Sequence, residues 1–255
     1  MSPTAGSRLA GAAVAAAALV LSATPSASAA PSAAAAGCPD VEVVFARGTG
    51  EPPGVGGMGQ AFVDSVHSKI GPKSFGVYPV NYPATTDFPT AMEGIQDASH
   101  HVEEMAANCP NTKMVLGGFS QGAAVMGFTT AATIPDGAPA DAPQPMPPDI
   151  ADHVAAVALF GTPSNQFMNS IGAAPIVIGP LYVPKTTELC AAGDPVCSAG
   201  GDWAAHNSYV DDGMVDQAAT FAVNHLTAQS PAPGQPGPTA RPPLTSPWHE
   251  EPDSP

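Results

Sequence analysis

The chain is poor in positive charge. It has seven lysines and arginines against 22 aspartates and glutamates in 255 residues, which gives a formal net charge of −15 at pH 7. Nucleic acids and anionic membrane surfaces bind through a basic footprint, so both are disfavoured as partners. Beyond its first thirty residues the sequence also lacks an apolar run of about 18 residues, the length that a transmembrane helix needs. Stable insertion into a membrane is therefore not expected.

The N-terminal segment has the features of a secretory signal peptide over residues 1–29. A weakly basic start is followed by an apolar stretch over 9–21 and by small residues suited to cleavage. An Ala-rich spacer covers 30–37, and the region 228–255 is rich in proline, so we expect a disordered tail there. These boundaries leave 38–227 as one domain of a secreted protein, either extracellular or associated with the cell envelope.

Cysteine is scarce, with four in the whole chain. In a secreted protein four cysteines suggest two disulfides. Cys190 and Cys197 are close enough in sequence to close a small loop. Cys38 and Cys109 each precede an expected strand, so they would lie at the same sheet edge if those strands are parallel neighbours. We therefore predict the pairs Cys38–Cys109 and Cys190–Cys197.

Two patterns resemble cofactor or metal sites but are better explained without a ligand. The segment 54–59 fits G-x-G-x-x-G, yet Asn81 stands where a dinucleotide site would want an acidic residue. The segment 100–104 contains two histidines and two glutamates, but it lacks the H-E-x-x-H spacing of zinc enzymes. We predict a glycine-rich loop and a solvated helix face, with no metal and no cofactor.

Strands and helices alternate along the domain. Apolar runs predict strands over 41–47, 75–80, 114–119 and 154–160, with a short edge strand over 186–189. Helical spacing of apolar residues predicts helices over 58–70, 88–107, about 121–133 and 214–226. Such alternation is typical of a parallel sheet covered on both faces. We predict an α/β fold, a three-layer sandwich with a central, mostly parallel sheet.

The most informative segment joins the central strand to the helix that follows it. Gly118, Ser120 and Gly122 form a Gly-x-Ser-x-Gly pattern between these two elements. In this pattern a serine occupies a sharp turn with its hydroxyl exposed, and the N–H of the next residue, here Gln121, faces a developing oxyanion. Ser120 is a candidate nucleophile, with an ordinary glycine-rich turn as the alternative.

A nucleophilic serine on this kind of turn needs an aspartate and a histidine that follow it in that order. His206 is the best placed histidine for the base. Asp194 lies inside the expected Cys190–Cys197 loop, which would hold its carboxylate rigidly, although an Asp-Pro turn explains the residue equally well. On spacing alone the acid stays open, and the competing carboxylates are Asp202, Asp211 and Asp212.

Together these features resemble the cutinase family of secreted serine esterases, and in particular its bacterial branch. The resemblance runs from about Cys38 to Leu226. It rests on Phe-Ala-Arg-Gly-Thr-Gly-Glu at 45–51, Gly-Gly-Phe-Ser-Gln-Gly at 117–122, Leu-Phe-Gly at 159–161, the segment between the cysteines at 190–197, and His-Asn-Ser-Tyr at 206–209.

The resemblance implies an α/β-hydrolase fold and hydrolysis of carboxylic esters without a cofactor. It implies that Ser120 is the nucleophile, Asp194 the acid and His206 the base. It also implies that Thr49 is the second oxyanion-hole residue beside Gln121, and that the substrate is an ester or lipid. Acyl transfer to envelope lipids and a non-catalytic surface role are the alternative functions.

Two loops are expected to flank the open end of the serine turn. One runs from Tyr82 to Phe88, and the other covers 171–183 and is notably apolar. We predict that Tyr82 and Phe88 face Ile178 and Leu181 across an acyl groove, although a packed loop interior would also explain the second segment. The predicted enzyme is a monomer with an open cleft for short-to-medium acyl chains, and a Pro-rich insert over 134–148 is the candidate for a lid.

Overall fold

The computed structural model describes residues 37–136, 138 and 140–228 of the chain. The predicted signal peptide over 1–29, the spacer up to residue 36 and the Pro-rich tail from residue 229 lie outside the described residues. None of the described helices combines the length and the apolar character that crossing a bilayer requires.

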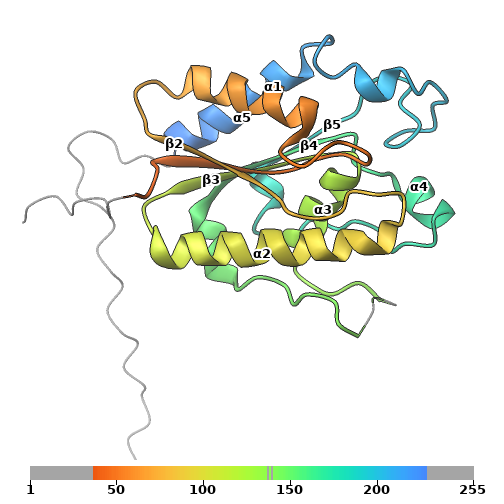
Figure 1. The fold of residues 1–255 in the computed structure, drawn as a ribbon, viewed down its shortest axis with the longest axis horizontal. Coiled ribbons are helices and arrows are strands. Elements are labelled where there is room, and N and C mark those ends of the chain that lie inside the picture. Colours follow the sequence, from red (N-terminus) through yellow and green to blue (C-terminus); the bar gives the residue numbers. More distant parts are fainter. Residues whose placement is uncertain (1–36, 137, 139, 229–255) are drawn as a thin grey trace, which may run out of the picture. The chain divides into compact units, whose positions relative to one another are not determined.

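Five strands form one sheet in which every neighbouring pair is parallel (Figure 1). Almost every residue of β1, β3 and β4 is buried, as expected for strands that are covered on both faces. The order across the sheet is β2-β1-β3-β4-β5. The strands are β1 (Val41–Ala46), β2 (Phe75–Pro79), β3 (Lys113–Phe119), β4 (Val154–Phe160) and β5 (Thr186–Leu189).

Helices cover both faces of this sheet and confirm the three-layer α/β architecture. On one face α1 (Gly56–Lys69) packs beside α5 (Met214–Ala228), and on the other α2 (Ala91–Asn108) packs beside α3 (Gln121–Thr129) (Figure 1). Each face has its own apolar core of buried side chains. The short elements are α4 (Asn165–Ser170) and the 3-10 turns η1 (Phe88–Thr90), η2 (Pro148–His153), η3 (Val183–Lys185) and η4 (Ala205–Asn207).

Two expected helix boundaries differ from the structure by more than two residues. The helix expected from residue 88 begins with the 3-10 turn η1, which contains Pro89, and becomes α-helical at Ala91. The helix after the serine turn ends at Thr129 instead of near 133. The carbonyl of Thr130 accepts a hydrogen bond from the N–H of Gly179 at 2.9 Å, so it is engaged with a distant loop and does not extend α3.

Both disulfides predicted from the sequence are present. Cys38–Cys109 joins the segment before β1 to the end of α2, and Cys190–Cys197 closes the loop that follows β5. The first therefore ties together the segments that precede β1 and β3. The second stiffens a loop at the opposite end of the strands.

The order in which strands are added to the sheet switches sides at β1. The chain places β2 on one side of β1 and then β3 on the other. Strands β1 and β3 are neighbours, and Ala46 pairs with Gly118 at their carboxyl ends. The loop after β1 leads to α1 on one face, whereas the turn after β3 leads to α3 on the other (Figure 1). The two connections therefore diverge at the carboxyl ends of β1 and β3. This leaves the kind of crevice where α/β proteins bind ligands.

Candidate active site

Ser120 occupies a strained turn between β3 and α3. Its backbone angles, φ 55° and ψ −118°, are unusual for a residue with a side chain. A Cβ on Gly118 would lie 2.2 Å from the carbonyl oxygen of Gly122, and a Cβ on Gly122 would lie 2.0 Å from that of Ala46. Both flanking glycines are therefore required sterically, and the turn presents the serine at the crevice.

Ser120, His206 and Asp194 form a continuous hydrogen-bonded chain. His206 Nε2 lies 2.9 Å from Ser120 Oγ, and His206 Nδ1 lies 2.8 Å from Asp194 Oδ2. The imidazole ring stacks on Phe119 with 5.0 Å between ring centroids. A neutral imidazole that donates from Nδ1 accepts at Nε2, so this arrangement suits removal of the serine proton.

The competing carboxylates are engaged elsewhere. Asp202 accepts a hydrogen bond from the N–H of Ala204 at 2.9 Å, and Asp212 accepts one from the hydroxyl of Ser208 at 2.6 Å. Asp211 is exposed. Of these four aspartates, Asp194 is the one whose carboxylate lies within hydrogen-bond distance of His206 in the described structure.

Asp194 is fully buried, with an exposed fraction of 0%. Its Oδ1 accepts from the N–H of Val196 at 2.8 Å, and its Oδ2 accepts from the hydroxyl of Tyr209 at 2.5 Å as well as from His206. Burial by itself raises the pKa of this carboxyl, but the donors from Tyr209, His206 and Val196 outweigh it and hold the pKa below its ordinary value. The carboxylate is therefore charged at neutral pH.

Thr49 and Gln121 meet in front of Ser120. Thr49 follows β1, and Gln121 is the first residue of α3, where helix N–H groups favour negative charge. The Thr49 hydroxyl donates to the Gln121 side-chain oxygen at 3.2 Å, and the Gln121 amide donates to the carbonyl of Thr85 at 3.1 Å. Their side chains are thus held in place, and both residues line the cavity at the serine.

The anchoring of the loop that carries Thr49 was not predicted from the sequence. The Glu51 carboxylate accepts from the N–H groups of Gly48 and Gly57, each at 2.7 Å. Arg47 is 4% exposed, and its guanidinium donates to the carbonyls of Glu51 at 2.9 Å and Tyr82 at 2.6 Å. A charged residue directly after a buried strand was the available signal, since such a charge must find partners.

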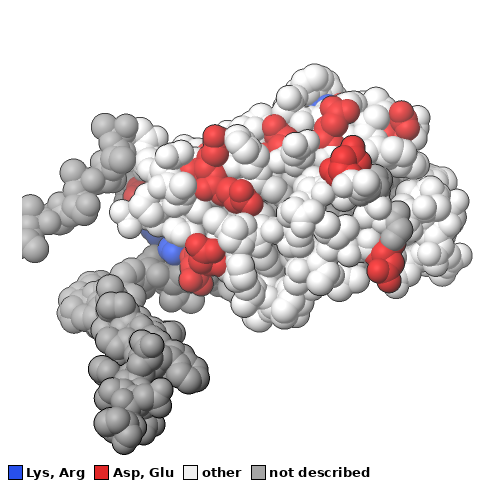
Figure 2. All heavy atoms as spheres, turned by 90° about the horizontal axis from the view of Figure 1, so that it is seen from below, with Lys and Arg blue, Asp and Glu red and all other residues white. Residues whose placement is uncertain are grey.

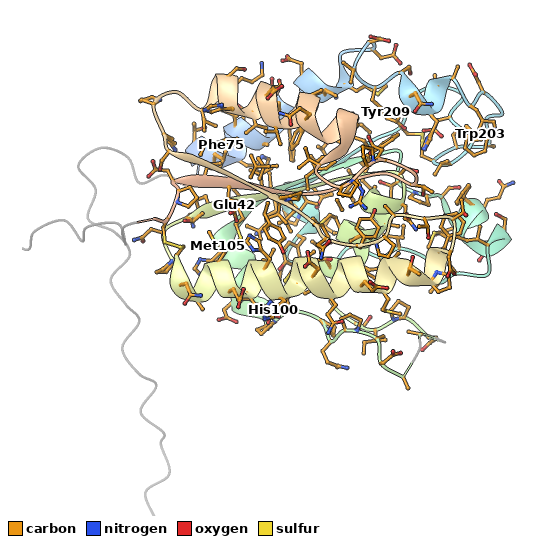
Figure 3. The ribbon with its side chains drawn as sticks, in the orientation of Figure 1. Glu42, Phe75, His100, Met105, Trp203 and Tyr209 are labelled. Atoms are coloured by element: carbon orange, nitrogen blue, oxygen red, sulfur yellow. A yellow bond between two sulfur atoms is a disulfide. The ribbon has the colours of Figure 1, made fainter. Side chains whose placement is uncertain are left out.

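A cavity of about 890 Å³ opens at Ser120 and His206. Its walls come from α2, α3, the segment 167–174 and parts of the Pro-rich insert, including Ile134 and Pro145. Large apolar side chains dominate this lining, among them Phe88, Met92, Ile95, Phe128, Phe167 and Ile171. Trp203, labelled in Figure 3, lines the cavity and is 61% exposed, and its ring is nearly perpendicular to the His206 ring with 6.0 Å between the ring centroids.

Three residues expected to line the acyl groove lie elsewhere. Tyr82 is buried behind the crevice, and its hydroxyl donates to the carbonyl of Arg47. Ile178 packs against the core on the α2–α3 face, and Leu181 is 52% exposed. The apolar loop 171–183 contributes only its first part to the cavity, so Phe88 alone of the four predicted residues is among its walls.

The two histidines of the segment 100–104 in α2 have different partners. His101 Nε2 lies 2.9 Å from a carboxylate oxygen of Glu42 in β1, whereas His100 is exposed beside Glu104. Among the described residues no group of three or more His, Cys, Asp or Glu side chains could hold a metal ion. Figure 2 shows acidic side chains scattered over the molecular face seen there, with few basic ones.

Known proteins with similar sequences and folds include carboxylesterases, a phospholipase and a cutinase. The Cutinase family model matches residues 37–226. A probable carboxylesterase of Mycobacterium tuberculosis, Culp5, is 74% identical over 165 residues, which are 65% of this chain and 95% of the relative. Phospholipase Culp4 of the same organism is 49% identical over 218 residues, 86% of this chain and 90% of the relative.

A solved structure extends this similarity to three dimensions. Trichoderma reesei cutinase in complex with a phosphonate inhibitor shares 32% identity with this chain at a TM-score of 0.58. The match covers 74% of this chain and 77% of that one.

Proposed function

The chain belongs to the cutinase family and is a carboxylic ester hydrolase, and from this premise we propose that Ser120, His206 and Asp194 are its catalytic triad. One observation carries the proposal: the Ser120 hydroxyl, the His206 imidazole and a fully buried Asp194 carboxylate are linked by hydrogen bonds at the mouth of an apolar cavity. A weak nucleophile, a base and an orienting acid in this order are what ester hydrolysis by covalent catalysis requires.

In the proposed reaction, His206 Nε2 takes the proton of Ser120 as its Oγ attacks the ester carbonyl. The N–H groups of Thr49 and Gln121 stabilise the oxyanion, and Asp194 stabilises the imidazolium. The ester C–O bond then breaks, and His206 returns the proton to the departing alcohol. Water next attacks the acyl-enzyme, losing its proton to His206, and the carboxylic acid leaves as Ser120 recovers its proton.

We further propose that the cavity accepts short-to-medium acyl chains. It follows α3 from Ser120 to Phe128, a span of about 12 Å at 1.5 Å per residue. A zigzag hydrocarbon advances roughly 1.3 Å per carbon, given a C–C bond of about 1.5 Å, so this wall matches about nine carbons. Each methylene buried there contributes about 0.8 kcal/mol to binding.

The nucleophile is tested by Ser120→Ala. Loss of this hydroxyl is expected to reduce turnover by about 10⁶-fold and to abolish labelling by a fluorophosphonate probe. Ser68→Ala, which changes an exposed serine of α1, is the matched control and should keep both properties. Substantial esterase activity in Ser120→Ala protein with a native circular dichroism spectrum would reject the triad. Products that depend on an added acyl acceptor would instead indicate acyl transfer.

The acyl site is tested by chain length. For the wild-type protein, kcat/KM on p-nitrophenyl esters should rise from acetate to about the nine-carbon acyl chain and then level off. Ala124 lies on α3 one turn beyond Ser120 and lines the cavity. Ala124→Leu should therefore lower kcat/KM for octanoate while acetate hydrolysis changes little. An equal loss on both esters would contradict this placement of the acyl chain.

We also propose that the protein is secreted and acts as a monomer. Its two disulfides favour an oxidising compartment, and every group of the proposed reaction comes from one chain. N-terminal sequencing of protein from culture medium would test the predicted cleavage near residue 29. Sedimentation would test the oligomeric state.

A further inference from the structure

We propose that Tyr209 is a positioning residue, whose hydroxyl sets the basicity of His206 through the Asp194 carboxylate. The inference rests on the proposed function of Ser120, His206 and Asp194. It adds a fourth side chain to their hydrogen-bonded chain, one that touches neither the substrate nor the reacting atoms.

The position of the Tyr209 hydroxyl carries this inference. It donates to Asp194 Oδ2 at 2.5 Å, the same oxygen that lies 2.8 Å from His206 Nδ1. Tyr209 and His206 therefore share one acceptor atom, while the other carboxylate oxygen is bound by the N–H of Val196 at 2.8 Å. A change in the Tyr209 bond alters directly the charge that faces the imidazole.

The ring and hydroxyl of Tyr209 are held on several sides. The residue, labelled in Figure 3, is 1% exposed. Its ring makes edge contacts with Phe119 and Phe160 at centroid distances of 5.8 and 6.1 Å. The hydroxyl lies 3.4 Å from Cys197 Sγ, and a Cβ on Gly161 would come within 2.8 Å of it. Because a disulfide sulfur is a weak acceptor, the Asp194 carboxylate is the dominant partner of the hydroxyl.

Sharing Oδ2 has a definite electrostatic consequence. A hydrogen bond from Tyr209 draws charge from the carboxylate and weakens its attraction for a protonated His206. The imidazole then stays neutral, and able to act as a base, to a lower pH. Burial first and the Asp194 carboxylate second raise the pKa of Tyr209 far above neutrality, so the hydroxyl is a donor throughout this range.

Few other titratable groups face this cluster. Phe119 of β3 and Phe160 of β4 are apolar, and Cys197 is oxidised. On the flanking loops, the Asp202 carboxylate accepts from the N–H of Ala204, and Glu51 lines the cavity while its carboxylate accepts from the N–H groups of Gly48 and Gly57. Asp194 is therefore the charged group that bonds to the His206 imidazole, and Tyr209 is the titratable side chain that bonds to the same Asp194 oxygen.

The test is the pH profile of Tyr209→Phe, which removes the hydroxyl and keeps the ring. The acid limb of kcat/KM reports the free-enzyme base. It should move to higher pH by about half a unit, since one of three donors is lost from a carboxylate that itself shifts a neighbouring pKa by about 1–3 units. We expect kcat to fall severalfold at unchanged KM, and the low-field proton signal of His206 Nδ1–H to move.

Tyr182→Phe is the matched control, because Tyr182 is also buried and its hydroxyl has no hydrogen-bond partner in the described structure. Its pH profile should equal that of the wild type. An acid limb of Tyr209→Phe that stays in place or moves to lower pH would overturn the proposal, even if activity falls.

A second substitution should shift the acid limb of kcat/KM in the opposite direction. It also tests the proposal if Tyr209→Phe does not fold. Replacing Tyr209 with 3-fluorotyrosine makes a stronger donor and should move the acid limb to lower pH; a move upward or none overturns the proposal. Stoichiometric fluorophosphonate labelling of Ser120 in the same preparations separates the two hypotheses. Labelling that fails in active wild-type protein rejects the triad, whereas normal labelling with an unmoved limb rejects only the role of Tyr209.

Discussion

At the scale of single residues, Gly161 shows how little free space surrounds the proposed triad. It follows β4 with φ +59°, a conformation that suits glycine. A Cβ at this position would lie 2.8 Å from the Tyr209 hydroxyl and 3.2 Å from both Asp194 Oδ2 and His206 Cε1. The absence of one side-chain carbon therefore allows the histidine, the carboxylate and the tyrosine to meet.

We predict that Gly161→Ala lowers both stability and activity, whereas the control variant below loses stability alone. The positive φ should cost about 1–2 kcal/mol of unfolding free energy, and displacement of His206 should reduce kcat by at least about tenfold. Gly71→Ala is the control, because Gly71 has φ +70° and an alanine Cβ there would meet no atom within 4 Å. Chemical denaturation of both variants measures the loss of unfolding free energy, and esterase kinetics measure the loss of kcat. Equal activity in the two would show that the packing around Gly161 does not matter.

At the scale of elements, the Glu51 carboxylate organises the loop from Gly48 to Val55, which leads into α1. Glu51 accepts hydrogen bonds from the N–H of Gly48 in this loop and from that of Gly57 in the first turn of α1, and the N–H of Gly50 donates to the carbonyl of Ala84 at 2.7 Å. These bonds fix the backbone around Thr49, the proposed oxyanion-hole residue. The loop therefore needs no regular secondary structure to present an N–H group accurately.

Glu51→Gln should disturb this presentation, because a neutral amide offers one acceptor oxygen where the carboxylate uses two. We expect kcat to fall about tenfold, less than the 10²–10³ that follows complete loss of an oxyanion-hole donor, with KM for short esters nearly unchanged. Asp64→Asn removes the same charge from an exposed position on α1 and should be neutral. An unchanged kcat in Glu51→Gln would show that the loop holds its shape without this carboxylate.

At the scale of the whole molecule, buried tyrosines link stability to alkaline pH. Tyr82, Tyr182 and Tyr209 are each less than a tenth exposed, and burial is the largest cause of their raised pKa, about 12 for Tyr182. A raised pKa in the folded state means that the unfolded chain loses its phenolic protons first. The stabilisation is complete below pH 10, the ordinary tyrosine value, and declines as pH rises above it.

The unfolding free energy should therefore fall above pH 10 by up to about 1.4 kcal/mol per pH unit for each buried tyrosine. Urea denaturation between pH 8 and about pH 11, with tyrosinate absorbance recorded in parallel, measures this slope. Tyr182→Phe should reduce the slope by the share of one tyrosine. An identical pH dependence in that variant would contradict the assignment.

Much of the fold and part of the site followed from local patterns. Buried strands are visible in the sequence as apolar runs such as 154–160, and alternation with helices implies a parallel sheet. The Gly-x-Ser-x-Gly turn was also predictable, because the steric need for Gly118 and Gly122 arises within a few residues of Ser120. The disulfide pairing followed in turn from the expected strand order.

Contacts between distant segments were decided only by the tertiary structure. The chain order left Asp194 in competition with Asp202, Asp211 and Asp212, and three of the four residues expected along the acyl groove lie outside the cavity. Tyr209 joins Asp194 from 15 residues away, and Arg47 reaches the carbonyl of Tyr82 from 35. Sequence periodicity tells which face of an element is apolar, but side chains on separate loops meet according to strand register and loop packing, which involve the whole domain.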